Sequence, residues 1–560
     1  MIYSGPKQYF RQVRKVMLYA RHTLQHMNLI WSYGNTKNIA FITAERNYFE
    51  LFQTFRGQNL QFLRTKCNVL GQNDRFQFID KHEQNNQNRS AQPELLPFEA
   101  IPSADNGNFR YFLHLKEFAS KINSLITEQW QNRFHEQIDE YHLQFGPIFR
   151  KSLGSVDAIF VKSPNLIRDV FAHEGKYPKH PLPEAWTFYN KLHKCERGLF
   201  FMDDEEWLKT RRQLAPLMLC NDKRFNDAIE IASENLIEHW RKNAAVNQQN
   251  MAEIPQILTS LYGWSIRVLI GIIFGRAAGQ MFNDLRETID QLAHIVQNVF
   301  EDTVPFQTIS PQLARKLRLS IWTKFDANVT KTLNIANQIV EYGWHQSQCD
   351  GLLNEMQKIG MPKEMIQRIF IDLIIAAGDT TAVSTQWALY LLSQNISIQN
   401  DIRNELKIID RYDTPLIKGT VREALRLFPV ATFIGRILDE EAILNNYRIH
   451  KHSIIIISMY SAGRDEKSFP NPNAFQPWRW NRDPSTGTPY AVKHAQSSIP
   501  YALGSRNCIG QRIANAQMYV ILAKLLSSYE INLLNTNDID VVMRLIMMPS
   551  NKLRLAIKKI

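Results

Sequence analysis

The sequence predicts a single large, mainly α-helical domain with a small β region, and three observations lead to this fold class. The chain has 560 residues, of which 44% are hydrophobic and 11% aromatic, which is enough to build a large core. Helical periodicity dominates from Glu205 to Gln394. Strand-like runs, in contrast, are few and short, and no internal repeat divides the chain.

The elements can be assigned in chain order. Residues 111–145 show a helical period, as does the run from Gln511 to Leu526. Short β-branched or apolar runs predict strands at Ile148-Phe149, Ala158–Val161 and Ile454–Ser458. The first two runs lie on either side of Gly154 and should form a hairpin. We expect the folded domain to span residues 96–560.

The first 70 residues differ in composition from the rest of the chain. No Asp or Glu occurs from Met1 to Ala44, where Lys and Arg face apolar side chains at helical spacing. An acid-free, basic amphipathic start is typical of a mitochondrial transit peptide, whereas a secretory signal has an apolar central segment. An ordinary surface helix or an interfacial membrane helix is the alternative. We expect residues 1–70 to be a transit segment.

A linker and the absence of long apolar runs complete the domain organisation. Residues 71–95 are rich in Gln and Asn, and this composition predicts a poorly ordered linker. No run of 18 apolar residues occurs, so no transmembrane helix is expected.

Net charge and cysteine usage narrow the classes of partner and site. The formal charge of +12 suits an acidic protein, an anionic membrane surface or nucleic acid. Nucleic acid is the least favoured, because zinc-finger spacing, an RNA-binding aromatic motif and a basic zipper are all missing from the sequence. The five cysteines are scattered without a CxxC pair, which argues against a disulfide framework and a structural zinc site.

The strongest motif surrounds Cys508 near the end of the sequence. Gly504 and Gly510 flank this cysteine, so the backbone can bend closely around a bulky planar cofactor. The turn can aim amide N–H groups at the sulfur, and the helix predicted from Gln511 favours a thiolate through its N-terminal dipole. Arg506 is placed to pair with an anionic group such as a haem propionate. A loop cysteine with neighbouring glycines and no cofactor is the alternative.

This run resembles the cysteine loop of the cytochromes P450, F-x-x-G-x-R-x-C-x-G, with Tyr501 in place of the usual Phe. The resemblance implies that Cys508 is the axial thiolate ligand to the iron of haem b. Gly504, Arg506 and Gly510 are carried over as cofactor-binding residues, and Tyr501 as an aromatic ring under the haem face. The fold implied is the cytochrome P450 fold, a single large haem-enclosing domain.

A second motif, Ala376–Thr381, lies in an apolar helix predicted from Ile369 to Leu392 and resembles the P450 oxygen-binding helix, A-G-x-D-T. Thr380 lies one turn after the first alanine, so we expect its hydroxyl, a carboxylate and small side chains to share a locally widened region. The resemblance implies that Asp379 and Thr380 are catalytic and relay protons to dioxygen. Ala377, which stands where the family usually has Gly, is expected to border the cofactor.

Glu423 and Arg426 resemble the E-x-x-R motif of the P450 K-helix, and Arg479 lies in a run that matches F-x-P-x-R. Taken alone, an i,i+3 pair of this kind arises often by chance. Together the three residues imply a network that braces the cysteine loop and has a structural role.

Three further residues are implied as propionate contacts. Trp207 and Arg211 resemble the W-x-x-x-R motif of the C-helix, which holds a haem propionate. Arg436, after Pro429, falls where the family often has a second propionate contact. The matches run from about Phe98 to Arg554.

Finer details resemble the mitochondrial branch of the family, namely Phe98–Pro102, Gly175–Pro178 and Gly463–Asp465. That branch receives electrons from an acidic ferredoxin of the adrenodoxin type, which an NADPH-dependent reductase supplies. The resemblance implies that Lys418 and Arg422 dock this ferredoxin, and Arg512 extends the basic face. The chain departs from the branch by carrying Gln511-Arg512 where relatives often have two arginines. A peripheral position on the mitochondrial inner membrane is implied, with the endoplasmic reticulum as the alternative.

The run Phe370–Thr381 looks most like arthropod ecdysteroid-synthesising members, in particular the Shadow-like ecdysteroid 2-hydroxylases. This resemblance implies hydroxylation of an ecdysteroid precursor at C2. Val430–Ile434 and Leu545–Met548 are candidates for an apolar pocket by position. The alternatives are a mitochondrial P450 that acts on foreign compounds, a haem-binding protein without turnover, and a catalytically silent helical interaction protein.

Overall fold

The computed structural model describes residues 95–105 and 133–560, apart from short gaps at 154–155, 220–222, 244, 247–250, 308, 347, 484–486, 488–491, 493 and 536–538. The predicted transit segment, residues 71–94 of the predicted linker and residues 111–132 of the first predicted helix lie outside the described residues. The structure therefore tests the prediction for the folded domain, residues 96–560, and leaves the predictions for the first 94 residues untested.

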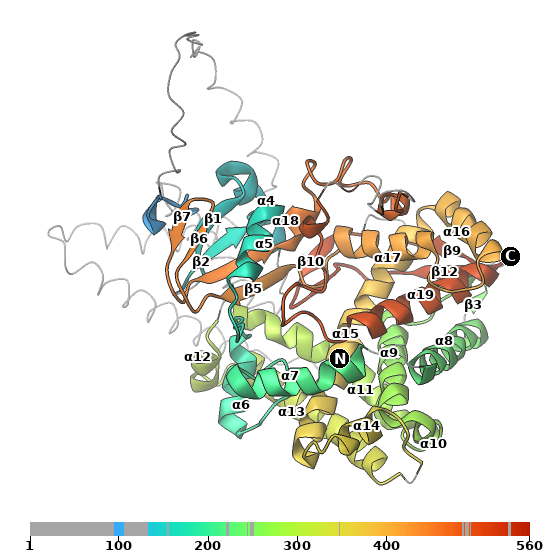
Figure 1. Ribbon diagram of the computed structural model, residues 1–560. Helices are drawn as coiled ribbons and strands as arrows, with labels where there is room; N and C mark the ends of the chain where they lie inside the picture. The colour runs from blue at the N-terminus through green and yellow to red at the C-terminus, as the bar shows by residue number, and fades with distance from the viewer. Residues whose placement is uncertain are drawn as a thin grey trace, which may run out of the picture. The chain divides into compact units, whose positions relative to one another are not determined.

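A four-stranded sheet has the order β1 (Ile148–Leu153), β2 (Val156–Val161), β8 (Ile454–Ser458) and β5 (Phe433–Ile437). β1 and β2 form an antiparallel hairpin, β8 runs parallel to β2, and β5 runs antiparallel to β8. The predicted hairpin and the predicted strand at Ile454–Ser458 are both confirmed. In Figure 1 these strands lie together with α4 (Phe134–Phe145) and α5 (Pro164–Ala172), on one side of the described domain.

The remaining strands form smaller sheets. Their bounds are β3 (Ala245–Val246), β4 (Ala252–Glu253), β12 (Leu555–Lys559) and β9 (Tyr529–Leu533) in one sheet, then β10 (Val541–Met543) with β11 (Met547–Pro549), and β6 (Ala442–Leu444) with β7 (Tyr447–Ile449).

Helices make up most of the chain between and around these sheets, as predicted. They are α6 (Glu184–His193), α7 (Asp204–Met218), α8 (Lys223–Asn243), α9 (Ile257–Phe274), α10 (Ala278–Asp284), α11 (Arg286–Thr303), α12 (Pro311–Lys316), α13 (Ser320–Trp344), α14 (Leu352–Lys358), α15 (Lys363–Ser393), α16 (Ile396–Ile408), α17 (Pro415–Leu427), α18 (Met459–Gly463) and α19 (Gln511–Ser528). Short 3-10 turns include η1 (Phe98–Ala100) and η4 (Pro477–Trp480).

Local sequence explains where the helices that carry the site begin. Thr414 caps α17, because its hydroxyl accepts the N–H of Ile417 at 3.4 Å and Pro415 occupies the first helical position. Pro362 directly precedes α15, and Gly510 directly precedes α19. The predicted helices at Ile369–Leu392 and Gln511–Leu526 are thus confirmed, with the first extended toward its N-terminus.

Helix α15 runs through the main core and packs most extensively against α9. The two helices approach closely at Gly378, where an added Cβ would lie 3.3 Å from Cγ1 of Ile266. The segment Ile257–Asp284 is long and apolar enough to cross a membrane. Its most apolar stretch of 18 residues has a mean hydropathy of 1.7, yet 78% of that stretch is buried inside the domain. Its hydropathy is accounted for by its place in the core.

Candidate active site

The cysteine loop bends sharply just before α19. Gly504 has a φ of 76° and Ala502 has a φ of 59°, a region that glycine adopts readily and alanine rarely. The N–H of Cys508 donates to the carbonyl of Tyr501 at 2.9 Å, which closes the loop. The Tyr501 ring packs against the main core, and its hydroxyl donates to Oδ1 of Asn515 at 2.7 Å.

Cys508 is an exposed residue, and yet its thiol lies deep in the domain. Burial raises the pKa of this thiol, while backbone N–H groups of Gly510 and Gln511 and the charge of Arg211 act in the opposite direction. The residue is exposed by surface area although protein atoms surround it. The two observations agree if the sulfur borders an interior hollow, and a metal bound there would deprotonate the thiol.

Accessible residues also occur in the middle of α15. Ala376 and Thr380 are exposed and Ala377 is half-buried, although the helix around them is largely buried. The Thr380 hydroxyl donates to the carbonyl of Ala376 at 3.0 Å. The expected widening does not occur, because residues 363–393 form an unbroken α-helix. Thr380 and the small side chains share one accessible face, as i and i+4 positions do.

Asp379 points away from that accessible face. Its carboxylate is fully buried, and neither oxygen has a hydrogen-bond partner among the described residues. Burial raises its pKa well above the ordinary value, and only the distant charge of Arg544 opposes this effect. The expectation that Asp379 and Thr380 share one region is therefore not met in this structure, and burial disfavours the charged form of Asp379.

Trp207 and Arg211 lie on α7. The first turn of this helix carries the acidic side chains of Asp204, Glu205 and Glu206, which interact favourably with the helix dipole. Both predicted residues are buried. An Nη2 N–H of Arg211 donates to Oδ1 of Asn507, which directly precedes the cysteine. Burial lowers the pKa of Arg211, and the neighbouring thiol opposes that effect. The C-helix pair and the cysteine loop are thus brought together.

Arg506 lies between α7 and the loop that follows Gly175. Its guanidinium stacks 4.6 Å from the centre of the Trp207 ring and pairs with Asp203 at 2.8 Å. An Nη1 N–H donates to Nδ1 of His180 at 2.7 Å. The Nε of Arg506 and the Nε2 of His180 are both buried without a partner among the described residues. Two donors therefore remain for an anion at this place.

Arg436 on β5 is buried beside the same loop. Its Nε donates to Oε2 of Glu174 at 2.9 Å, and its Nη1 and Nη2 donate to the carbonyls of Gly435 and Leu503. A guanidinium has five N–H donors, so two of them have no partner among the described residues and are available to an anion. Glu174 also accepts the N–H of Ser505 at 3.0 Å through Oε1.

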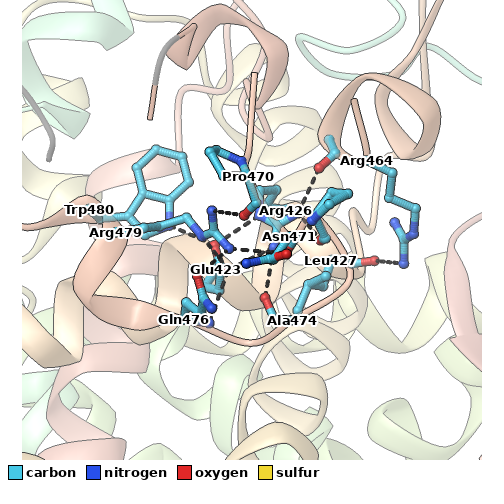
Figure 2. Close-up of polar contacts among 12 residues, drawn as sticks. Glu423, Arg426, Leu427, Arg464, Pro470, Asn471, Ala474, Gln476, Arg479 and Trp480 are labelled. Atoms are coloured by element: carbon cyan, nitrogen blue, oxygen red, sulfur yellow. Dashed lines mark hydrogen bonds and ion pairs between the residues drawn. The ribbon is translucent and has the colours of Figure 1, made fainter. Parts of the chain in front are cut away.

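Glu423, Arg426 and Arg479 form one fully buried network, which Figure 2 shows. The Glu423 carboxylate accepts from Nε and Nη2 of Arg426 at 2.9 and 2.7 Å and from Nε of Arg479 at 2.8 Å. Trp480 adds its indole N–H at 2.9 Å and Gln476 its backbone N–H at 3.2 Å. The structure brings together all three predicted members.

Both guanidiniums also bind backbone carbonyls of the segment before η4. Arg426 donates to carbonyls of Gly463, Pro472 and Ala474, and Arg479 donates to those of Pro470 and Asn471. The network therefore holds α17 against the segment 463–480 and η4. The segment that this network holds, residues 463–480, precedes the cysteine loop in the chain. A network that fixes this segment is consistent with the structural role expected of it.

The three predicted docking residues are partly engaged with other groups. Lys418 pairs with Asp413 at 2.6 Å, and Arg422 is exposed with its guanidinium 5.8 Å from the centre of the Trp480 ring. Arg512 is exposed and binds the carbonyl of Leu219.

The two candidate pocket segments meet in the structure. The N–H of Met547 donates to the carbonyl of Val430 at 3.2 Å, which joins β11 to the segment that leads into β5. Trp387 on α15 donates to the carbonyl of Met547 at 3.1 Å. Most residues of both segments are buried, whereas Ala431 is exposed. Apolar side chains therefore gather next to α15.

Three residues of the site escaped sequence reasoning, namely Glu174, His180 and Asp203. Glu174 and His180 flank the run Gly175–Pro178, which was noted only as a feature of the branch. Asp203 directly precedes α7, where an acidic residue commonly begins a helix. Their contacts with arginines more than 200 residues away leave no trace in local sequence.

The site fits a haem group on the chain's own features. An accessible thiol, the orphaned donors of Arg506 and His180, and the spare donors of Arg436 match a planar cofactor with a metal centre and anionic propionates.

Comparisons with known proteins agree with this chemistry. The family model for cytochrome P450 matches residues 119–557. Cytochrome P450 315a1, mitochondrial, of Drosophila melanogaster is 39% identical over 451 residues, which is 78% of this chain and 85% of that protein. The mitochondrial cholesterol side-chain cleavage enzyme of Mesocricetus auratus is 26% identical, over 81% of this chain and 88% of that protein. Cytochrome P450 11B1, mitochondrial, of Rattus norvegicus is also 26% identical, over 82% and 91%.

The family match covers well over half of the chain, and the fold is mainly helical with small sheets. Members of the family are oxidoreductases that hold haem through a cysteine thiolate. The chain belongs to the cytochrome P450 family of haem-thiolate monooxygenases.

Proposed function

We propose that Cys508 is the axial ligand and that the chain hydroxylates a lipophilic steroid in mitochondria with ferredoxin-supplied electrons. One oxygen atom of dioxygen enters a C–H bond, and the other leaves as water with two electrons and two protons. The observation that carries the assignment is the accessible thiol of Cys508 inside a buried core, with Arg211 beside it. When bound, haem supplies the activation of dioxygen, and its thiolate ligand donates electron density.

The chain's own groups divide into two roles in this proposal. Thr380 presents a hydroxyl on the accessible face of α15, and Asp379 is a buried carboxyl group at the adjacent position whose pKa burial raises. Together they hold and transfer protons toward the oxygen. Trp207, Arg211, Arg436 and Arg506 bind the propionates, supported by the spare and orphaned donors around them.

Electron supply by an acidic ferredoxin of the adrenodoxin type is part of the proposal. Relatives named as mitochondrial support this partner, with an NADPH-dependent reductase upstream. Arg422 and Arg512 are exposed, and Lys418 keeps 37% of its side chain exposed beside Asp413. Arg411 pairs with the same aspartate at 3.1 Å, so three cations, Arg411, Lys418 and Arg422, lie beside the two carboxylates of Asp413 and Glu405. A net positive face of this kind steers an acidic partner.

The proposed substrate is an ecdysteroid precursor, and the proposed reaction is hydroxylation at C2. The resemblance of residues 370–381 to ecdysteroid-synthesising members supports it, as does the cholesterol named for a relative. The apolar segments that meet beside α15 suit a sterol skeleton.

The proposed location is the mitochondrial inner membrane, with peripheral attachment. Three relatives carry the word mitochondrial in their names, and the first 44 residues are free of acidic side chains. Import of the full chain into isolated mitochondria, followed by carbonate extraction, tests both parts. A chain that is not imported, or that stays in the membrane after carbonate extraction, would contradict the location or the peripheral attachment.

Replacement of the ligand tests the central assignment. Cys508→Ser is expected to abolish the red-shifted Soret band of the reduced carbonyl complex, because serine cannot supply a thiolate. Cys349→Ser is the matched control, since Cys349 is a free thiol outside the loop. A band that survives in Cys508→Ser would remove the ligand assignment.

Product analysis tests the reaction and its substrate. The purified holoprotein is incubated with ferredoxin, its reductase and NADPH, with a sterol panel in one arm and foreign compounds in the other. A 2-hydroxylated ecdysteroid precursor supports the proposal, whereas turnover of foreign compounds alone supports the first alternative. Thr380→Ala should lower the ratio of product to electrons consumed, and an unchanged ratio would remove Thr380 from the proton transfer. A wild type that forms no product in either arm would favour a haem protein without turnover.

A further inference from the structure

Glu174 is a buried carboxylate that contacts both halves of the cofactor site. Only 7% of its side chain is exposed. Oε2 pairs with Nε of Arg436 at 2.9 Å, and Oε1 accepts the N–H of Ser505, three residues before Cys508, at 3.0 Å. One carboxylate therefore joins a proposed propionate-binding guanidinium to the cysteine loop.

The packing around Glu174 is tight on the side of the loop. A Cβ added to Gly504 would lie 1.8 Å from Oε1 of Glu174, and Gly504 has a φ of 76°. Neither the space nor the backbone conformation admits a larger residue there. The loop is thus shaped around the carboxylate, which holds it in one position.

The charges of the site make Glu174 more than a packing residue. Arg211, Arg436 and Arg506 bring three positive charges, and Glu174 and Asp203 bring two negative ones. Burial and the two nearby arginines lower the pKa of His180 to about 3, so its ring is neutral at pH 7. One positive charge remains for two propionates, and without Glu174 there would be two.

The two carboxylates of the cluster differ in their exposure to solvent. Asp203 keeps 47% of its side chain exposed, so water screens its charge. Glu174 lies where the effective dielectric constant is lower, and its field reaches further into the site. A negative charge near the iron favours the ferric state, which carries one more positive charge than the ferrous state.

We propose that Glu174 is a redox-tuning and positioning residue, which anchors the cysteine loop through Ser505 and lowers the reduction potential of the haem by neutralising Arg436. The reaction concerned is transfer of one electron from reduced ferredoxin to ferric haem, which gives ferrous haem and oxidised ferredoxin. A low potential withholds that electron until substrate has bound. This inference rests on the proposed propionate-binding role of Arg436.

The test compares two variants that each remove one carboxylate charge while keeping the shape of the side chain. Midpoint potentials of the haem iron are measured by spectroelectrochemistry in the wild type, Glu174→Gln and Asp203→Asn holoproteins. Glu174→Gln is expected to favour the ferrous state about tenfold, a positive shift of about 59 mV for one electron. Asp203→Asn is expected to shift the equilibrium about twofold or less, because its charge is screened. Equal shifts in both variants, or none in Glu174→Gln, would overturn the proposal.

The reduced carbonyl spectrum separates this inference from the assignment of the ligand. A thiolate-type Soret band in wild type and variants shows that Cys508 still binds iron, whatever the potentials are. Should Glu174→Gln fail to retain haem, Glu174→Asp decides the question, since it keeps the charge on a shorter side chain. Haem retention in Glu174→Asp supports a role of the charge, whereas haem loss from both variants would reduce Glu174 to a packing residue.

Discussion

Two clusters of buried arginines lie in the same domain, and they differ in how fully their N–H donors are used. All five donors of Arg426 are bound, to Glu423 and three carbonyls, and Arg479 is nearly as fully bound. In the second cluster, the Nε of Arg506 and the Nε2 of the neighbouring His180 are buried and have no partner in the part of the chain that the structure describes.

The contrast separates a structural network from a ligand site. A buried polar group without a partner destabilises the folded protein by about 1–3 kcal/mol, so a protein keeps such groups where something else binds them. The cluster around Glu423 uses every N–H of Arg426 and four of the five of Arg479, so it offers little to a ligand. The cluster around Arg506 has donors left for an anion, which in the proposed function is a haem propionate.

The largest expected effect is the loss of the saturated network in Glu423→Gln. The variant leaves two buried guanidiniums without a counter-charge, and breaking a buried pair in this way destabilises a protein by about 3–5 kcal/mol. We expect little folded holoprotein, measured by urea unfolding and by haem content.

The matched control is Glu253→Gln, which breaks a bidentate pair with Arg554 at 2.8 Å on the surface. Such pairs contribute about 0–1 kcal/mol, so the midpoint of unfolding should hardly change. Comparable losses in the two variants would show that saturation and burial do not distinguish the Glu423 network.

How far the sequence predicted this contrast depends on the range of each contact. The members of the saturated network were predicted because an i,i+3 pair and a short proline-containing run resemble two motifs of the family, and each motif is contained in a short stretch of sequence. The cysteine loop was predicted for the same reason, since its glycines and Arg506 lie within ten residues. The strands and helices near them follow from apolar periodicity, which is also local.

The second cluster was predicted only in part, because its carboxylates come from distant segments. Glu174 pairs with Arg436, 262 positions away, and the sequence around Glu174 carries no pattern that predicts this contact. The separation of Asp379 from the face of Thr380 was missed for another reason. Adjacent positions on an unbroken helix point about 100° apart, and only the absence of the expected widening decides their relation.

The contrast between groups with and without hydrogen-bond partners also applies to two buried histidines, His142 and His180, and it predicts how stability changes at low pH. Both ring nitrogens of His142 have partners, at 2.9 Å from the carbonyl of Gly146 and from Oγ of Ser458, and burial lowers its pKa to about 4. Because the folded pKa lies below the unfolded value of about 6.5, stability is complete above pH 6.5 and is lost as the pH falls toward 4. The loss approaches about 3 kcal/mol for this histidine.

Urea midpoints of the apoprotein between pH 7 and pH 4.5 test this expectation. The side chain in His142→Asn cannot titrate. The free energy of unfolding of this variant should be lower at pH 7, and it should fall less steeply with decreasing pH, by about 1.4 kcal/mol per pH unit. An identical decline in the variant would show that His142 is not protonated on unfolding. In the holoprotein, propionates near His180 should raise the pKa of His180 and reduce its share of the decline, while that of His142 stays.

The orphaned cluster predicts opposite effects on apoprotein and holoprotein. Arg506→Met keeps the aliphatic stem over Trp207 and removes the charged donors. Hydrogen bonds to a charged group contribute about 1.5–3 kcal/mol, so haem should leave the variant about 10–100 times faster. Transfer of haem to a haem-free acceptor protein measures that rate. The apoprotein should unfold at the same or a higher urea concentration, and a less stable apoprotein with an unchanged haem transfer rate would contradict the ligand role.

The smallest expected effect on stability is that of Lys418, a partly exposed side chain outside both arginine clusters. Lys418 pairs with Asp413 on the surface, so Lys418→Glu should change stability by less than about 1 kcal/mol. If this face docks an acidic ferredoxin, the reversed charge should slow electron transfer several-fold at low salt, and the difference should shrink as screening shortens the range of the field. Stopped-flow reduction over a salt series measures it, with Lys552→Glu, at the turn before β12, as the control. A rate equal to that of the wild type at every salt concentration would place the docking face elsewhere.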